Sequence, residues 1–356
     1  MYKYMTRCKQ ICASGNGLAM SLSDYRVYAY SVLTFVSQMM LPSKQALALE
    51  TRATQMLVAA PWNAVTKQLL WDGKQIGLQQ EVPSLWMGSQ AAMWRCAVES
   101  KVFDKCCAIL KSSFDSDDSF FLPPYANWFS SSPFMQVKNN YDRHVGLGAT
   151  LSVKPGHSTQ RHMYEALKQM YVGSCAITII HRRLRHYDAS ISVKHAETVT
   201  CRLARVGSQL TPAIHSSVLR TICNAWCTSA RFQENVLHCR FCGERESDSL
   251  RHYLSCKSSY AALTELLPFG IFRHRDDGLA QLGILAAELD EQQLFINAIM
   301  ADALLWAFNH TSMQAIHEPA GSILLKQLLH ARMRQQATRN ACCRSIIQAA
   351  QRMNMW

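Results

Sequence analysis

Four potential metal ligands fall within eighteen residues of this 356-residue chain. Two residues separate Cys239 from Cys242, nine more precede His252, and three more precede Cys256, giving the spacing C-x2-C-x9-H-x3-C. A C-x2-C turn lets both sulfurs face one point, and Gly243 frees the backbone to make it. His252 and Cys256 are one helical turn apart, so we expect both on one helix face. The pattern predicts a zinc-knuckle module holding Zn2+, and its four ligands favour a structural role.

Other arrangements of this segment stay open. Cys223 and Cys227 are also four apart, and His238 directly precedes Cys239, so one of them can replace a named ligand. The alternative to a metal site is a set of core thiols beside a surface histidine. We favour the four named ligands because knuckle spacing and helix-turn spacing coincide only there. Fourteen cysteines without a recognisable export signal favour an intracellular location, nuclear or cytoplasmic, where thiols stay reduced.

Apolar residues recur at helical intervals along most of the chain, and only 176–180 alternates as a strand would. The fold class we predict is therefore mainly α: one or more multi-helix bundles with the small zinc-knuckle module. The longest apolar stretch, residues 28–41, is too short for a bilayer, so we expect no membrane association. We divide the chain into an irregular segment 1–22, a helical region 23–110, a loop-rich linker 111–160, a basic helical region 161–256 and a C-terminal helical region 257–356 with a basic tail.

Individual helices are predicted from caps and periodicity. One long helix should begin at Ser23 or Asp24 and stop at 41–43. The others are expected at about 47–60, 64–71, 85–110, 160–187, 193–207, 216–231, 260–267, 279–289, 292–310 and 323–353.

The net charge of +12 is unevenly distributed: residues 151–256 carry +7, residues 321–356 carry +6, and the segment between them carries −5. Such a distribution favours a polyanionic partner, most simply nucleic acid. Aromatic residues interleave with the arginines near the cysteines, as in proteins that stack bases. The alternatives are that the aromatics pack the zinc module and that the arginines only solvate it. The candidate nucleic-acid-binding residues are Arg182, Arg183, Arg185, Arg220, Arg231, Arg240, Arg245 and Arg251.

Catalytic patterns are missing from the sequence. It has no phosphate-binding Walker loop, no G-x-S-x-G and no H-E-x-x-H. The acidic pair Asp117–Asp118 lies among serines and lacks the aromatic residue of a polymerase metal motif, so we interpret it as a solvated turn. The chain is therefore not expected to be an enzyme by itself.

Two stretches together resemble non-LTR (LINE-type) retrotransposon reverse transcriptases. SDYRVYAYSVLTFVSQMMLP, followed by ALETRATQMLVAAPWN, is similar to the start of their thumb, and VLRTICNAWCTSARFQ with CRFC and RHYLSC is similar to their Cys-Cys-His-Cys module. The resemblance makes region 23–110 thumb-like and implies Cys239, Cys242, His252 and Cys256 as zinc ligands. It also implies that the basic helices touch RNA or target DNA. The catalytic aspartates of that family's palm are absent from this chain.

Two functions follow as hypotheses. The first is a zinc-stabilised nucleic-acid-binding fragment of a retroelement reverse transcriptase, without its own polymerase active site. The alternative is a helical, zinc-containing protein–protein interaction module with an incidental basic surface.

Overall fold

The computed structural model describes residues 2–99 except 16, 35, 37–40 and 62–63, residues 159–266 except 173–174, 233–234, 236 and 246, and residues 291–311 and 320–353. Within these ranges every regular element is a helix and no strand occurs, which confirms the predicted fold class. None of the described helices has the length and apolar character needed to cross a membrane. The predicted linker, except for residues 159–160, and the predicted helix 279–289 lie outside the described residues.

The chain forms two compact units, each assembled from separate stretches of sequence. Unit 1 comprises Met1–Ala13, Asp24–Thr54 and Val82–Gly173, and unit 2 comprises Ser14–Ser23, Gln55–Glu81 and Ser174–Trp356. The boundaries of the five predicted regions stay a prediction.

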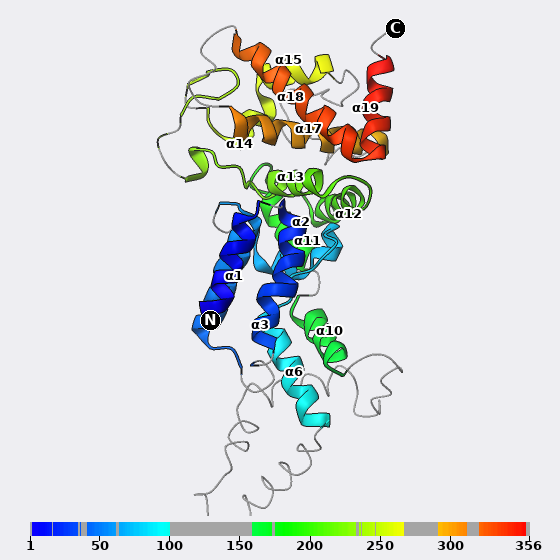
Figure 1. Ribbon diagram of the computed structural model, residues 1–356. Coiled ribbons are helices and arrows are strands. Elements are labelled where there is room, and N and C mark those ends of the chain that lie inside the picture. Colours follow the sequence, from blue (N-terminus) through cyan, green and yellow to red (C-terminus); the bar gives the residue numbers. More distant parts are fainter. Residues whose placement is uncertain are drawn as a thin grey trace, which may run out of the picture. The chain divides into compact units, whose positions relative to one another are not determined.

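Unit 1 is built from α1 (Tyr2–Ala13), the π-helix η1 (Tyr25–Tyr30), α3 (Ser31–Thr34), the larger part of α4 (Lys44–Val58), α6 (Leu85–Glu99) and α10 (Thr159–Tyr171). In its core the Tyr4 and Tyr25 hydroxyls are 3.0 Å apart and their rings meet edge to face. The buried Glu50 carboxylate accepts the Leu85 backbone N–H at the start of α6. Helices α6 and α10 lie side by side (Figure 1).

The prediction of an irregular segment at 1–22 is wrong, because α1 occupies most of it and α2 (Gly17–Asp24) begins within it. Tyr4, Cys8 and Ile11 follow helical spacing and are buried together. The predicted cap is also wrong: Asp24 has helical dihedral angles and makes no side-chain cap hydrogen bond, and the helix continues through it into η1. The described part of this helix ends with α3 at Thr34, and residues 35 and 37–40 lie outside the described residues, so the predicted stop at 41–43 stays a prediction. The next helix, α4, begins after Ser43, whose hydroxyl accepts from Ala46 N.

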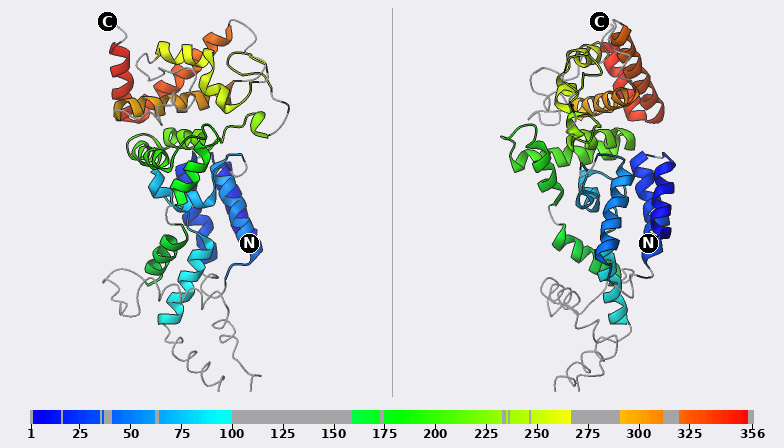
Figure 2. Two further views of the ribbon diagram at one scale, coloured as in Figure 1. Left: turned by 180° about the vertical axis from the view of Figure 1, so that it is seen from behind. Right: turned by 90° about the vertical axis from the view of Figure 1, so that its left-hand side faces the viewer.

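Unit 2 carries the predicted metal site. Its elements are α2, α5 (Lys67–Trp71), η3 (Gly73–Ile76), α11 (Cys175–Leu184), α12 (Val193–Gln209), α13 (Pro212–Ile222), η4 (Ala230–Phe232), α14 (Leu250–Ser255), α15 (Lys257–Leu266), α17 (Glu291–His310), α18 (Ala320–Arg339) and α19 (Ala341–Met353). Helix α17 is central: fourteen of its twenty residues are buried, so it is covered on all sides and not only along the predicted stripe. It contacts α12, α13, α18 and α19 (Figures 1 and 2).

Three further predictions need correction in unit 2. The helix predicted at 216–231 is α13, which begins earlier, at Pro212, and already ends at Ile222. The strand candidate 176–180 belongs to α11, where Ala176, Ile180 and Leu184 form a buried face at four-residue intervals. The single helix predicted at 323–353 is two helices, because Asn340 interrupts it and its side-chain oxygen caps α19 by accepting from Cys343 N at 2.9 Å.

Close backbone packing joins η3 to α12. Gly77 has a φ of +84°, and a Cβ at this position would lie 2.7 Å from Cα of Ala204. A Cβ on Gly207 would overlap the Gly77 carbonyl oxygen. Only glycine at both positions permits this approach. Nearby, buried His215 of α13 makes a 2.6 Å hydrogen bond from Nε2 to the carbonyl of Ile76.

Candidate metal centre

The structure brings the four predicted ligands together. One ligand atom from each of Cys239, Cys242, His252 and Cys256 lies within 4.8 Å of all the others. The Sγ atoms of Cys239 and Cys256 are 3.8 Å apart, and Sγ of Cys242 is 3.3 Å from Nε2 of His252. A tetrahedral zinc centre has S···S edges of about 3.8 Å and S···N edges of about 3.5 Å, given its usual bond lengths. The observed distances therefore fit an ion of this kind.

Backbone hydrogen bonds form the cysteine knuckle. The Gly243 N–H donates to the Cys239 carbonyl at 3.0 Å, and the Cys239 N–H donates to the Glu244 carbonyl at 2.9 Å. Gly243 completes this turn with a φ of +73°, in the left-handed region that favours glycine. The Phe241 N–H also donates to Sγ of Cys239 at 3.3 Å. The turn therefore holds both sulfurs in place through the backbone.

The second ligand pair differs from its prediction in one respect. His252 lies in α14, where the Ser249 hydroxyl caps the helix by accepting from His252 N at 3.3 Å. Cys256 lies outside this helix as its C-cap, with φ −61° and ψ 126°, and α15 begins at the next residue. The two ligands thus come from a helix and from a helix–helix junction, not from one helix face.

Electrostatics within the cluster favour negative charge at Cys256. Its pKa is lowered to about 4, chiefly because the Cys239 thiol donates a hydrogen bond to it. The same hydrogen bond raises the pKa of Cys239. Burial raises the pKa of Cys242, and hydrogen bonding to Cys256 raises the pKa of His252. Three thiols and an imidazole at this spacing are a donor set that a divalent cation satisfies.

A carboxylate that the sequence analysis did not name lies beside the histidine. Oε2 of Glu244 is 3.7 Å from Nδ1 of His252, the ring nitrogen that faces away from Cys242. Carboxylates in this position orient metal-binding histidines and make them more basic. The signal available in the sequence was an acidic residue two positions after the second cysteine.

An aromatic core supports the cluster from within unit 2. The Tyr253 ring is fully buried, and the centroids of Trp226, Phe241 and Phe308 lie 5.8, 5.1 and 5.0 Å from its own. The Tyr253 hydroxyl donates to the buried Asp248 carboxylate at 2.6 Å. Trp226, Phe241 and Tyr253 therefore pack the module, as the alternative interpretation of these aromatics held, and their faces do not lie open to nucleic-acid bases.

The eight candidate arginines fall into two groups. Four are exposed: Arg182, Arg185, Arg245 and Arg251. Four are partly buried: Arg183, Arg220, Arg231 and Arg240. Among the second group, the guanidinium of Arg240 lies 4.1 Å from the Phe308 ring centroid and donates to the Phe308 carbonyl at 3.1 Å.

The alternative ligands stay outside the cluster. Cys223 is fully buried, Cys227 and His238 are exposed, and none of the three belongs to the group of converging ligand atoms. In the part of the chain that the structure describes, this group is the one place where three or more potential ligands meet.

Over the residues that the structure describes, fold and site define an all-helical protein with a Cys3His group that could hold a metal ion. Comparison of the chain with models of known protein families, with curated proteins and with solved structures found no match.

Proposed function

We propose that this protein binds one Zn2+ through Cys239, Cys242, His252 and Cys256. The observation that carries the proposal is the convergence of four ligand atoms within 4.8 Å, with two inter-ligand distances close to the edges of a zinc tetrahedron. Soft thiolates with one imidazole favour zinc over magnesium or calcium, which take oxygen ligands.

The proposed role of the ion is structural. Four protein ligands leave no open coordination position for a substrate. Between α13 and α15 the described chain has only the three-residue η4 and the six-residue α14 as regular elements. A cross-link from residue 239 to residue 256 supplies folding free energy that such short elements lack.

We further propose that the zinc module and its neighbouring helices bind nucleic acid. Support comes from exposed Arg245 and Arg251, which lie between the second and third ligands in sequence, and from exposed Arg182 in the last turn of α11 and Arg185 just after it. The pKa of Arg183 is lowered, first by burial and then by repulsion from neighbouring Arg231 and Arg182. Like charges gathered in this way gain most from a polyanion that neutralises them.

The resemblance to LINE-type reverse transcriptases also supports this proposal. A Tyr- and Leu-rich helical stretch followed by a Cys-Cys-His-Cys module resembles the tail of those proteins in order, and the four ligands that the resemblance implies are the four residues whose ligand atoms converge. We therefore propose a nucleic-acid-binding role without polymerase chemistry in this chain, and an intracellular location that keeps the thiols reduced.

Salt-dependent binding to single-stranded RNA tests the nucleic-acid role. Phosphate contacts release counterions, so affinity should fall steeply as salt rises. Arg245→Glu combined with Arg251→Glu should lower affinity and reduce the logarithmic salt slope by about 1.4, or about 0.7 per lost contact. Lys3→Glu combined with Lys9→Glu, the same charge change at two exposed residues of α1, is the matched control. A shallow slope that the double variant leaves unchanged would refute the role.

One observation favours the second candidate, a protein–protein interaction module. Phe232 and Leu237, which precede the first ligand, are 48% and 42% exposed although both are large and apolar. Apolar side chains at an interface would account for this exposure. In that case Phe232→Asp with Leu237→Asp would abolish binding of the partner, whereas the nucleic-acid role predicts little change in RNA affinity for this variant.

A further inference from the structure

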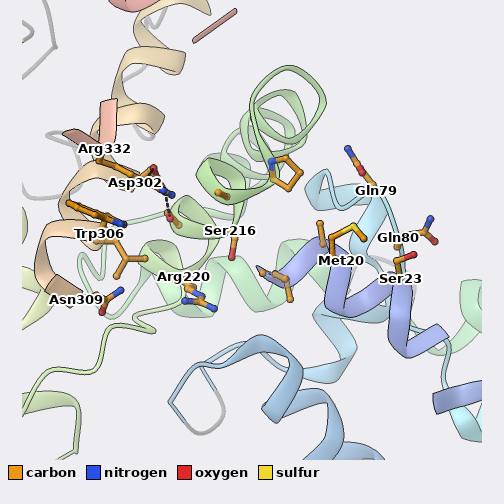
Figure 3. A pocket seen from close by; sticks show the side chains of 17 residues that line it. Met20, Ser23, Gln79, Gln80, Ser216, Arg220, Asp302, Trp306, Asn309 and Arg332 are labelled. Atoms are coloured by element: carbon orange, nitrogen blue, oxygen red, sulfur yellow. Dashed lines mark hydrogen bonds and ion pairs between the residues drawn. The ribbon is translucent and has the colours of Figure 1, made fainter. Parts of the chain in front are cut away.

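Unit 2 also contains a cavity of about 460 Å3 that shares no lining residue with the Cys3His group (Figure 3). Two helices line it, and each contributes four residues spaced so that they lie on one face of the helix. From α13 these are Ala213, Ser216, Ser217 and Arg220, and from α17 they are Asp302, Leu305, Trp306 and Asn309. Residues of α2, residues 79–80, Pro212 at the start of α13 and Arg332 complete the lining.

The charges that line the cavity do not balance. Its lining includes two guanidinium groups, Arg220 and Arg332, and one carboxylate, Asp302. Asp302 is only 1% exposed and forms a bidentate ion pair with Arg332, at 2.7 Å to Nε and 3.1 Å to NH2. This pair neutralises Arg332 and leaves the charge of Arg220 uncompensated.

Additional hydrogen bonds make the Asp302 carboxylate unavailable to other groups. The Ser217 hydroxyl donates to Oδ1 at 2.7 Å, and the Gln336 amide donates to Oδ2 at 3.0 Å. With both oxygens engaged, Asp302 serves to fix α18 against α17 and α13. It is therefore not a site for a cation.

Arg220 makes one hydrogen bond and forms no ion pair with a carboxylate among the described residues. Its NH2 group donates to the Val58 carbonyl at 2.6 Å, while its buried Nε has no hydrogen-bond acceptor. Burial lowers the pKa of this arginine. A partly buried guanidinium without a carboxylate partner is costly unless an anion compensates its charge.

We propose that this cavity binds a small organic anion, a phosphate or a carboxylate compound, whose charged group lies against Arg220. The volume falls in the range of small-molecule sites, about 300 to 1,000 Å3. Arginine presents a planar donor group that suits either anion. Trp306, whose ring stacks on His310, offers an apolar wall, and Ser216 and Asn309 offer hydrogen bonds for the rest of the molecule.

Calorimetric titration of the full chain tests the proposal. The probes are adenosine monophosphate and glucose 6-phosphate, with adenosine and glucose as their uncharged counterparts, and citrate as a carboxylate. At least one anion should bind with one-to-one stoichiometry and at least tenfold more tightly than an uncharged probe. Preference for a phosphate probe or for citrate identifies the chemical source of the anion.

Variants locate the binding. Arg220→Met should weaken it at least tenfold, whereas Arg334→Met, at an exposed position of α18, should leave it unchanged. Asn309→Glu adds a negative charge at an exposed wall residue and should also weaken binding, which keeps the test valid if Arg220→Met fails to fold. Absence of anion binding below 1 mM, or binding that Asn309→Glu and Arg220→Met leave intact, would overturn the proposal. Binding of RNA but of no small probe would also overturn it, and would assign Arg220 to the nucleic-acid surface.

Discussion

The guanidinium of Arg240 lies over the ring of Phe308, 4.1 Å from its centroid, and donates to the carbonyl of the same residue. These two residues are 68 positions apart, and they join the cysteine knuckle to the central helix α17. Arg240→Lys keeps the charge but loses the planar stacking and the directed hydrogen bond. We expect the free energy of unfolding to fall by about 1–2 kcal/mol, from the loss of a cation–π contact and a hydrogen bond to a charged group.

Chemical denaturation measures this change, and Arg245→Lys, at the exposed end of the knuckle, serves as the control. RNA affinity should stay close to that of the wild type for Arg240→Lys, because its side chain packs inward. Equal stability of the two lysine variants would contradict the structural role of Arg240.

Glu244 should increase metal affinity through His252. Glu244→Gln removes the negative charge that lies 3.7 Å from Nδ1 of the imidazole. Loss of such a partner typically costs about 10–100-fold in metal affinity, and we expect the lower end because Glu244 is exposed. Competition with a chromogenic chelator measures the change, and exposed Glu197→Gln on α12 is the control. If both variants hold the metal equally, Glu244 does not support the histidine.

Gly207 should be intolerant of even a methyl group. Alanine usually stabilises a helix interior by about 1 kcal/mol over glycine. Here the added Cβ would overlap the Gly77 carbonyl oxygen, which is backbone and cannot move aside cheaply. We therefore expect Gly207→Ala to lower the melting temperature, with a cost of about 1–3 kcal/mol. Ser208→Ala, the next residue and exposed, should be nearly neutral. A stabilised Gly207→Ala variant would contradict the close packing of η3 and α12.

His215 should make stability depend on pH. Burial lowers its pKa below the ordinary 6.5, so the folded protein holds the ring neutral while the unfolded chain binds a proton more readily. The resulting stabilisation is fully present above pH 6.5 and is lost as pH falls through 6.5 towards the lowered pKa. One such group changes the free energy of unfolding by at most about 1.4 kcal/mol per pH unit.

Comparison with His215→Gln isolates this contribution, since the other titrating groups are common to both proteins. The variant should be less stable at pH 7.5, because the bond to Ile76 is altered, but should lose less stability between pH 7 and pH 5. Parallel pH curves for the two proteins would show that His215 does not titrate on unfolding.

Local sequence spacing was enough to predict the helical fold class and the four converging ligands. The C-x2-C turn is determined by its own backbone hydrogen bonds and by Gly243, and these involve residues close in sequence. The same reasoning missed α1, whose buried Tyr4, Cys8 and Ile11 follow helical spacing. It also joined α18 to α19, because a capping Asn340 resembles any polar residue of an exposed helix face.

Contacts distant in sequence could not be predicted. Arg332 has no acidic neighbour in the sequence and was assigned to a basic tail, yet it pairs with Asp302, thirty positions earlier. In the sequence, the aromatic residues near the cysteines fit both base stacking and core packing. The burial of Trp226 and Tyr253 in the structure favours core packing. The cavity beside Arg220 depends on how α13, α17 and α18 pack, which no local pattern records.

Zinc content of the purified full chain tests the central claim most directly. Elemental mass spectrometry should find one zinc per chain in the wild type and in Cys227→Ser, whose exposed thiol lies outside the ligand group. Cys239→Ser should lose the ion and unfold the segment around residues 220–256, seen as increased proteolysis there. A wild-type protein without stoichiometric zinc, or a Cys239→Ser variant that retains a full equivalent, would contradict the account.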